Sequence, residues 1–189
     1  MILEAWLKTA LSFCLPVTTI SFMRKIGLLS DTHGFLDPSI FVHFKDCDEV
    51  WHAGDIGSAE LLDQLGSFKP LQAVFGNIDG GSLRWELPEV YETEIEGVKI
   101  LMTHIAGPLG KYTPELRALL EEKKPDLLVC GHSHICKVAP DQKFALLYVN
   151  PGACGRHGFH QMRTVMRLTI ESGKVSGLEV VELGKRAST

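Results

Sequence analysis

Two histidines separated by one residue, His132 and His134, follow an apolar segment of the chain. In an extended segment successive side chains alternate between two faces, so we expect both imidazoles to project to the same side and to form half of a metal site. Asp31 and His33 repeat this spacing after another apolar segment. Three more apolar segments each end in a single residue that can bind a metal, namely Asp55, Asn77 and His104. Together these residues predict a metal-binding site.

The donor atoms of this set are all oxygens or imidazole nitrogens, from Asp31, His33, Asp55, Asn77, His104, His132 and His134. Such donors suit Mn, Fe or Zn, whereas an all-oxygen cage would suit Mg or Ca and thiolates would indicate structural zinc. If Asp55 bridges two cations, the other six residues divide into three ligands for each. Two cations about 3.5 to 4 Å apart can hold a phosphoryl group, lower the pKa of a bridging water and stabilise the leaving oxygen. The implied reaction is hydrolysis of a phosphate ester.

The first half of the chain alternates between short apolar segments and segments with helical spacing. The apolar segments contain no proline and predict buried strands, at residues 25–30, 48–53 and 71–75. Asp37-Pro38 predicts the start of a helix that reaches about residue 45, and Ser58 predicts the cap of a helix over residues 58–65. Residues 80–88 have no periodic pattern, which predicts a loop or a short irregular segment.

The second half of the chain contains predicted hairpins. Strands flank the two-residue turn Glu96-Gly97, and Thr113 caps a helix that ends before Pro125. The strands of this half are predicted at residues 91–95, 98–103, 126–130, 144–149, 164–170 and 175–181. This pattern indicates an α/β architecture with at least one mixed sheet. Ligands bind outside the carboxyl ends of strands in such sheets, and each of the seven candidate residues follows a strand.

The composition excludes several classes of protein. The chain has 189 residues, which suits one domain with a full core, and a net charge of −4. It has no run of Lys or Arg, so we expect no binding to nucleic acid. Its five cysteines are odd in number and lack C-x-x-C spacing, so neither a disulfide framework nor a thiolate zinc site is indicated. We expect buried thiols and a cytoplasmic protein.

Residues 1–22 are apolar but interrupted by Glu4, Lys8 and Pro16. They lack the basic start and the cleavage site of a secretory signal, and the apolar run is too short to span a membrane. We therefore expect an N-terminal extension over residues 1–22, with Met23 as a plausible true start, and a single domain over residues 23–189. No association with a membrane is expected.

The ordered set of Asp31-x-His33, Gly54-Asp55, Gly76-Asn77, His104 and Gly131-His132-Ser133-His134 resembles the calcineurin-like metallophosphoesterase superfamily. The length of the chain is similar to that of its small bacterial and archaeal phosphodiesterase branch. The resemblance covers about residues 23–184 and implies a four-layer αββα sandwich of two mixed sheets flanked by helices. It also implies a phosphodiesterase that uses a metal-bridging hydroxide in an in-line displacement.

The same resemblance implies a distribution of the ligands over two divalent metal ions. One ion would be bound by Asp31, His33, Asp55 and His134, and the other by Asp55, Asn77, His104 and His132. Asp55, Asn77 and His104 are expected to be the catalytic members of this set. Mn is the first expectation for the metal, with Fe, Zn or Ni as alternatives, and the expected substrate is a small phosphoester. Formation of a homo-oligomer stays open.

The third motif departs from the pattern of the superfamily. Many members have His after Gly-Asn, where it is thought to protonate the leaving group or bind the phosphate, but this chain has Ile78. Some small phosphodiesterases carry Cys there, so the change does not imply an inactive enzyme, but it puts the turnover of poor leaving groups in doubt.

Other polar residues near the motifs admit two interpretations. His52 is expected to be packed or to support a ligand, and Asp79 to orient its loop. Arg156 could contact a phosphate through its planar guanidinium. His157 and His160 either line the mouth of the site or lie in a solvated loop.

A second function has to be kept open, because the same fold resembles the small subunit of the retromer sorting coat, a protein-binding scaffold. That relative lacks part of the ligand set, whereas every ligand position is filled here. The complete set favours an enzyme over a scaffold.

Overall fold

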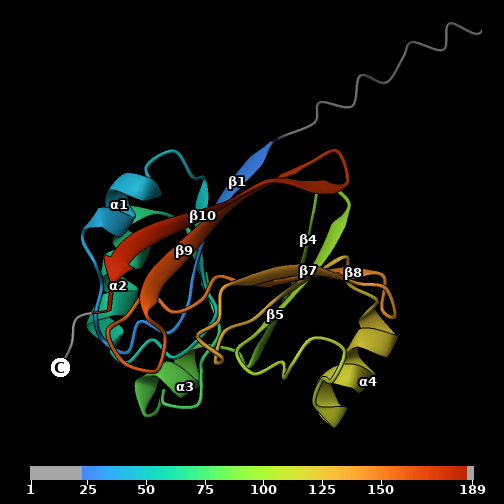
Figure 1. The fold of residues 1–189 in the computed structure, drawn as a ribbon, viewed down its shortest axis with the longest axis horizontal. Helices are drawn as coiled ribbons and strands as arrows, with labels where there is room; N and C mark the ends of the chain where they lie inside the picture. Colours follow the sequence, from blue (N-terminus) through green and yellow to red (C-terminus); the bar gives the residue numbers. More distant parts are fainter. Residues whose placement is uncertain (1–22, 187–189) are drawn as a thin grey trace, which may run out of the picture.

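The computed structural model describes residues 23–186, which form two five-stranded sheets (Figure 1). The strand order of the first sheet is β10 (Lys174–Lys185), β9 (Met162–Glu171), β1 (Arg24–Leu29), β2 (Glu49–His52) and β3 (Leu71–Ala73). The order of the second sheet is β4 (Val90–Ile95), β5 (Val98–Thr103), β6 (Leu127–Val129), β8 (Leu146–Asn150) and β7 (Lys137–Asp141). The expectations about residues 1–22 lie outside the described residues.

Both sheets are mixed. In the first sheet β1 runs parallel to β2 and β2 to β3, while β9 is antiparallel to both β1 and β10. In the second sheet β5, β6 and β8 are parallel, with antiparallel strands β4 and β7 at the two edges. The carboxyl ends of the parallel strands therefore deliver their following loops to one end of each sheet.

Helices cover the outer faces of the two sheets. Three of them pack beside the first sheet, α1 (Ser39–His43), α2 (Ala59–Phe68) and α3 (Ser82–Glu86). The helix α4 (Pro114–Lys123) packs on the second sheet, away from the other three (Figure 1). The order of layers is thus helix, sheet, sheet, helix, which confirms the predicted four-layer αββα sandwich.

Three apolar clusters hold these layers together. The central one lies between the sheets and includes Ile26 and Trp51 from the first sheet and Met102 and Val129 from the second, all fully buried. The other two clusters fill the space between each sheet and its helices. Since strands alternate their side chains, each central strand contributes to the layer between the sheets and to one outer layer.

Local capping residues set the starts of the two longer helices. The hydroxyl of Ser58 accepts a hydrogen bond from Leu61 N at 3.3 Å, and that of Thr113 accepts from Leu116 N at 3.2 Å. Each hydroxyl satisfies a backbone N–H group that the first turn of a helix leaves without a partner. Both predicted caps are therefore present.

The structure corrects the sequence-based prediction at three elements. The helix expected from Asp37 to about residue 45 is only α1, because Asp37 bonds to Ser39 and the chain turns after Phe44. The expected loop at residues 80–88 contains the short helix α3, whose Leu83 is buried in the outer core. The edge strand β7 was not predicted, because its sequence is polar and contains Pro140, which only an edge strand tolerates well.

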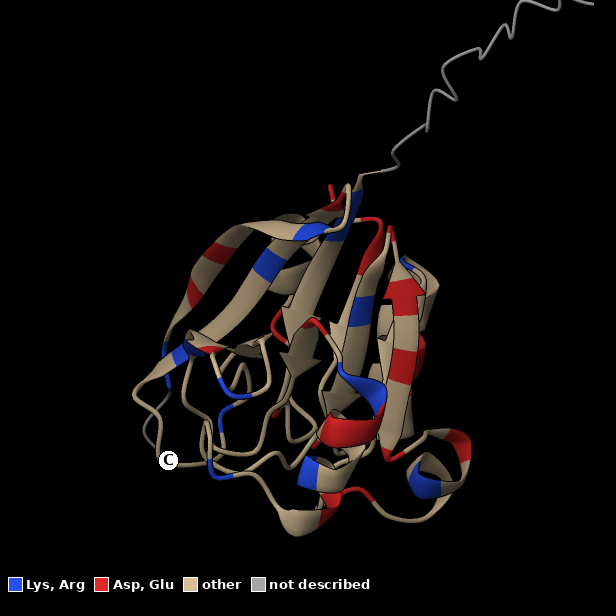
Figure 2. Cartoon of the chain, turned by 90° about the vertical axis from the view of Figure 1, so that its right-hand side faces the viewer, with Lys and Arg blue, Asp and Glu red and all other residues tan. Residues whose placement is uncertain are grey.

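Charged residues of both signs are spread over the described ribbon. Figure 2 shows segments of Lys and Arg interspersed with segments of Asp and Glu, without a continuous basic stripe in that view. Within residues 23–186, none of the helices has the length and apolar character needed to cross a bilayer.

Candidate metal centre

The loops at the carboxyl ends of the strands bring the seven candidate residues together. Asp31, His33 and His134 form a first cluster, in which the possible ligand atoms all lie within 4.8 Å of one another. A second cluster meets the same criterion with Asp55, His104 and His132. Each cluster draws on both sheets, because residues 31, 33 and 55 follow β1 and β2 whereas residues 104, 132 and 134 follow β5 and β6.

In the first cluster, nitrogen and oxygen atoms face one another at short distances. His134 Nε2 lies 3.3 Å from His33 Nε2 and 3.2 Å from Asp31 Oδ1. Asp31 is fully buried, and its Oδ2 accepts a hydrogen bond from Ser30 Oγ at 2.7 Å. That hydrogen bond fixes the orientation of the carboxylate and leaves Oδ1 directed at His134.

The second cluster is arranged around His104. Its Nδ1 lies 2.7 Å from the carbonyl oxygen of Ala53, which can only accept, so Nδ1 carries the proton when the ring is neutral. The lone pair of Nε2 then points to Asp55 Oδ1 and Asn77 Oδ1, each at 3.2 Å. Three atoms that can donate electron pairs thus converge without a proton between them, an arrangement that suits a cation.

Asp55 lies between the two clusters. Its Oδ1 faces His104 of the second cluster, and its Oδ2 lies 3.7 Å from His33 Nε2 of the first. The backbone N–H of Ile78 donates to Oδ1 at 3.1 Å and holds the carboxylate in this orientation. Asp55 therefore has one carboxylate oxygen directed at each cluster.

The protonation equilibria differ between the two clusters, because burial holds the pKa of His33 below its usual value whereas the second cluster favours positive charge. Burial acts to raise the pKa of Asp55, but the hydrogen bond and charge of His104 outweigh it and hold that pKa below its usual value. Burial acts to lower the pKa of His104, but the carboxylates of Asp55 and Asp31 raise it above its usual value. A cation bound here would take the place of the imidazolium charge.

Glycines before Asp55 and Asn77 allow the two loops to pack closely. Gly54 has φ of +89°, and a Cβ atom on it would lie 2.6 Å from His104 Nδ1. A Cβ atom on Gly76 would collide with the carboxylate of Asp55. Glycine precedes Asp55 and Asn77 because a larger residue would collide with His104 at position 54 and with Asp55 at position 76.

The backbone at five of the candidate residues differs from the expected extended form. Asp31, His33, Asp55, His132 and His134 all have φ between +48° and +67°, in the left-handed region. The prediction that His132 and His134 project to the same side of a strand is therefore wrong, because both have a left-handed backbone and they join different clusters. The sequence favoured proximity for the correct residues but for an incorrect geometrical reason.

Asp79 organises the loops that carry the candidate ligands Asp55 and Asn77. Its carboxylate accepts hydrogen bonds from Gly57 N and Gly76 N, both at 2.8 Å, and from Ile56 N at 3.1 Å. It thereby ties the loop after β2 to the loop after β3. The structure places Asp79 in the loop-orienting role that was expected of it, outside the two clusters.

His52 is fully buried and supports the loop after β1, which carries Asp31 and His33. Its Nδ1 accepts from Gly54 N at 3.2 Å, so its Nε2 carries the proton and donates to Thr32 Oγ1 at 2.9 Å. Burial lowers the pKa of His52 to about 4, which keeps the ring neutral. It is a packed supporting residue rather than a member of either cluster, as expected.

The sequence assigns no role to two supporting residues, Ser30 and Asn150, although Asn150-Pro151-Gly152 resembles a turn of the superfamily branch. Ser30 holds the carboxylate of Asp31, as described above, and Asn150 Nδ2 donates to Gly131 O at 2.7 Å. Asn150 Oδ1 in turn accepts from Gly152 N at 2.9 Å, which fixes the turn that follows β8. The position of Ser30 beside Asp31 and that of Asn150 before a Pro-Gly turn were the available signals.

The loop over residues 155–161 lies against the first cluster. The ring of His157 is 4.9 Å from that of His33, and the ring of His160 is 5.3 Å from that of His134. His160 donates from Nε2 to Gly155 O at 3.1 Å. Of the two interpretations, a position at the mouth of the site fits these contacts better than a solvated loop.

Arg156 and Ile78 point to no partner within the clusters. The guanidinium of Arg156 stacks on Phe35, with Cζ 3.9 Å from the ring centroid, so its expected contact with phosphate stays untested. The side chain of Ile78 is 46% exposed beside Asp55. Solvent and substrate can therefore reach the position where a histidine was expected.

Comparisons with known proteins identify a family, a relative and two solved structures that are similar to this chain. A family model described as the calcineurin-like phosphoesterase superfamily domain matches residues 24–173. A probable metallophosphoesterase of Methanocaldococcus jannaschii is 31% identical over an alignment of 158 positions, which covers 77% of this chain and 76% of the relative. An archaeal phosphodiesterase of known structure superposes with a TM-score of 0.65 at 22% identity and covers 84% of this chain and 99% of its own. Vps29 of Entamoeba histolytica in complex with Zn²⁺ gives a TM-score of 0.60 at 19% identity, with coverages of 84% and 98%.

Proposed function

This chain belongs to the calcineurin-like phosphoesterase superfamily, and from that premise we propose that it is a dinuclear metal-dependent phosphodiesterase. As a member of the superfamily it is a metal-dependent phosphoesterase. One observation supports the dinuclear assignment above the others, the position of the Asp55 carboxylate, which faces a nitrogen ligand of each cluster.

The residues of the two clusters would share the metal ions as follows. One ion would be held by the first cluster and Asp55, the other by the second cluster and Asn77, whose amide oxygen completes that set. Two bound divalent cations would bind phosphoryl oxygens and lower the pKa of a water between them. Mn²⁺, which carboxylates suit, is the proposed metal, and Fe, Zn and Ni, which imidazoles suit, are the alternatives.

The chain itself orients these ligands. Ser30 and Ile78 N–H fix the two carboxylates, and Ala53 O fixes the His104 tautomer. Such partners keep ligand lone pairs directed at the metal and raise their basicity. The substrate would be a small phosphodiester in the cytoplasm, where the four cysteines of the described residues could stay as the free thiols they are here.

The test is the Asp55→Asn variant. Because even partners one shell beyond the ligands contribute about 10- to 100-fold, loss of the shared ligand should lower turnover of bis(p-nitrophenyl) phosphate by about 100-fold or more. Metal content, measured by mass spectrometry of the dialysed protein, should fall from two ions per chain. Asp63→Asn, an exposed carboxylate on α2, is the matched control. A variant that kept two ions and near wild-type turnover would show that Asp55 is not the bridge.

The alternative is a protein-interaction scaffold, favoured by the similarity of the fold to Vps29. Metal binding alone does not separate the two functions, since that Vps29 was crystallised with Zn²⁺. Turnover does. If the protein loaded with Mn²⁺, Fe²⁺, Zn²⁺ or Ni²⁺ hydrolysed no phosphodiester while retaining two ions, the scaffold would be the better description.

A further inference from the structure

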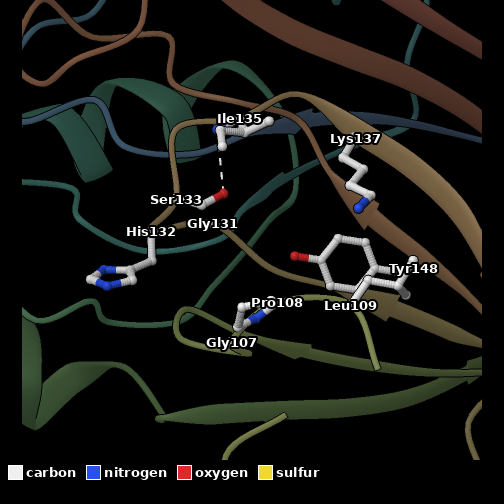
Figure 3. A pocket seen from close by; sticks show the side chains of 9 residues that line it. All are labelled: Gly107, Pro108, Leu109, Gly131, His132, Ser133, Ile135, Lys137 and Tyr148. Carbon is white, nitrogen blue, oxygen red and sulfur yellow. Dashed lines mark hydrogen bonds between the residues drawn. The ribbon is translucent and has the colours of Figure 1, made fainter. Parts of the chain in front are cut away.

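A groove of about 380 Å³ opens beside the second cluster. Its residues come from the loop after β5, the loop after β6 and strands β7 and β8, and include Leu109, His132, Ile135, Lys137 and Tyr148. Figure 3 shows His132 at one end of the groove and Lys137 with Tyr148 at the other. The volume is within the range of about 300 to 1,000 Å³ that is usual for small-molecule sites.

The groove and the second cluster share His132, whose imidazole is directed away from Tyr148 and Lys137 in Figure 3. His132 belongs to the second cluster, yet it is exposed and lines the groove. A phosphoryl group held by the ligand atoms of the second cluster would therefore have one of its ester groups within reach of the groove. The groove is thus a part of the candidate active site that the seven metal ligands do not explain.

The walls of the groove are apolar and partly aromatic. In Figure 3 the ring of Tyr148 lies between Leu109 and Lys137, and Ile135 lies nearer to Ser133. Ile135 is 64% exposed, although it is a large aliphatic residue, and Tyr148 is buried. Apolar surface left open beside a polar centre favours an apolar ligand group, because covering both surfaces removes them from water.

Lys137 adds a positive charge at the far end. Among the described residues, no carboxylate lies within ion-pair distance of its ammonium group. In Figure 3 the side chain extends along the groove toward Tyr148. A ligand group that ends in an anion would therefore complement both the apolar walls and the ammonium group.

We propose that this groove binds one ester group of the substrate, a flat aromatic group that carries a second negative charge at its far end. The inference rests on the proposed phosphodiesterase function and names its substrate class. Leu109, Ile135 and Tyr148 would hold the ring, and Lys137 would pair with the terminal anion.

The test measures binding of three phosphonates to the Mn²⁺-loaded protein by isothermal titration calorimetry: methylphosphonate, phenylphosphonate and 4-carboxyphenylphosphonate. Each has a single organic group, so only one orientation can fill the groove. Burial of a phenyl ring should tighten the dissociation constant by about tenfold or more relative to methyl. The terminal carboxylate should add about two- to fivefold, as expected for a partly exposed ion pair.

Two variants separate the contributions. Lys137→Met should abolish the advantage of the carboxylate while leaving the advantage of phenyl over methyl. Ile135→Asp should reduce the advantage of phenyl, and its exposed position makes an effect on folding small. Lys174→Met, an exposed lysine at the start of β10, is the control and should change none of the three constants.

Equal dissociation constants for the three phosphonates, or no binding of any of them, would overturn the proposed groove site. The same protein is assayed in parallel with bis(p-nitrophenyl) phosphate. If the binding differences are lost while turnover is intact, the proposed groove site is wrong and the proposed catalysis stands. If turnover is absent while the binding differences are intact, the proposed catalysis is wrong and the groove site stands.

Discussion

Ile78 lies in the loop after β3, at the position where the resemblance to the superfamily implies a histidine. Its backbone N–H serves the site by holding Asp55, but its alkyl side chain cannot donate a proton. A positioned general acid typically contributes about 10²- to 10⁴-fold by protonating the leaving oxygen. Ile78 therefore provides a backbone contact to Asp55 and no acid.

We predict that the rate depends steeply on the leaving group. Aryl phosphodiesters whose leaving group is stable as an anion should be hydrolysed measurably, whereas alkyl monoesters should react only weakly. The measurement is a Brønsted plot of the rate over a series of substituted phenyl esters. A shallow slope in the wild type would mean that another group supplies the proton, with His157, His160 and Arg156 as the first residues to examine.

The Ile78→His variant should flatten this dependence. We expect it to raise the rate on poor leaving groups by about tenfold or more, part of the range of a positioned acid, while the rate on nitrophenyl esters changes little. Ile78→Leu is the matched control, because it alters the side chain without adding a proton donor. The expectation fails if the histidine variant retains the steep slope of the wild type.

At the scale of elements, Asp37 joins the start of α1 to strand β9. Its Oδ1 accepts from Ser39 N at 2.9 Å and Ser39 Oγ at 2.7 Å, and its Oδ2 accepts from Arg163 at 2.6 Å. Burial acts to raise the pKa of Asp37, but the bonds from Ser39 and Arg163 outweigh it and lower the pKa to about 2. The carboxylate therefore stabilises the fold only in its charged form.

This pKa predicts a contribution to stability that depends on pH. Because the folded-state pKa lies below the unfolded value, the contribution is present above about pH 4 and is lost as the pH falls toward 2. Its size should be about 2 kcal/mol in the free energy of unfolding. Urea denaturation of the wild type and Asp37→Asn from pH 6 to pH 2 measures it, as a difference that shrinks toward acid. A difference that is constant over this range would contradict the assignment.

Elements with a local cause were predictable from the sequence, and those without one were not. Ser58 and Thr113 act within one turn of their own helices, so the chain near them contains the whole signal. The strand β7 forms because β8 offers it an edge, a long-range cause that its polar sequence does not reveal. The same holds for α3, which is anchored by the burial of Leu83.

The candidate site shows the same division. Its seven residues were predictable because each follows an apolar strand, but the left-handed turns at His132 and His134 were not. Asp and His adopt the left-handed region more often than most residues, but only a minority of them do so, and the packing of neighbouring loops decides which ones. The sequence thus predicted which residues meet but not how each one points.

At the scale of the whole molecule, every described strand and every candidate ligand lies after Met23. We predict that deletion of residues 1–22 leaves metal content, turnover and the melting temperature essentially unchanged. Circular dichroism and the phosphodiester assay of the truncated and full-length proteins measure this. Insolubility or a clearly lower melting temperature of the truncated protein would show that the segment packs on the domain.

The construction of each cluster from both sheets links metal supply to the integrity of the fold. An ion that joins Asp31 to His134, or Asp55 to His104, would act as a cross-link between the two sheets as well as a cofactor. By mass action, one site filled at a free metal concentration of 100 times its dissociation constant adds about 2.7 kcal/mol to the free energy of unfolding.

Chelation should consequently lower the melting temperature of the wild type, and lower it less in Asp55→Asn, which retains fewer ions to lose. Differential scanning calorimetry with and without EDTA measures the two shifts, and equal shifts would contradict the cross-link. In a cell short of the metal, unoccupied sites would lower the activity. A growing fraction of unfolded chains would also be exposed to proteolysis.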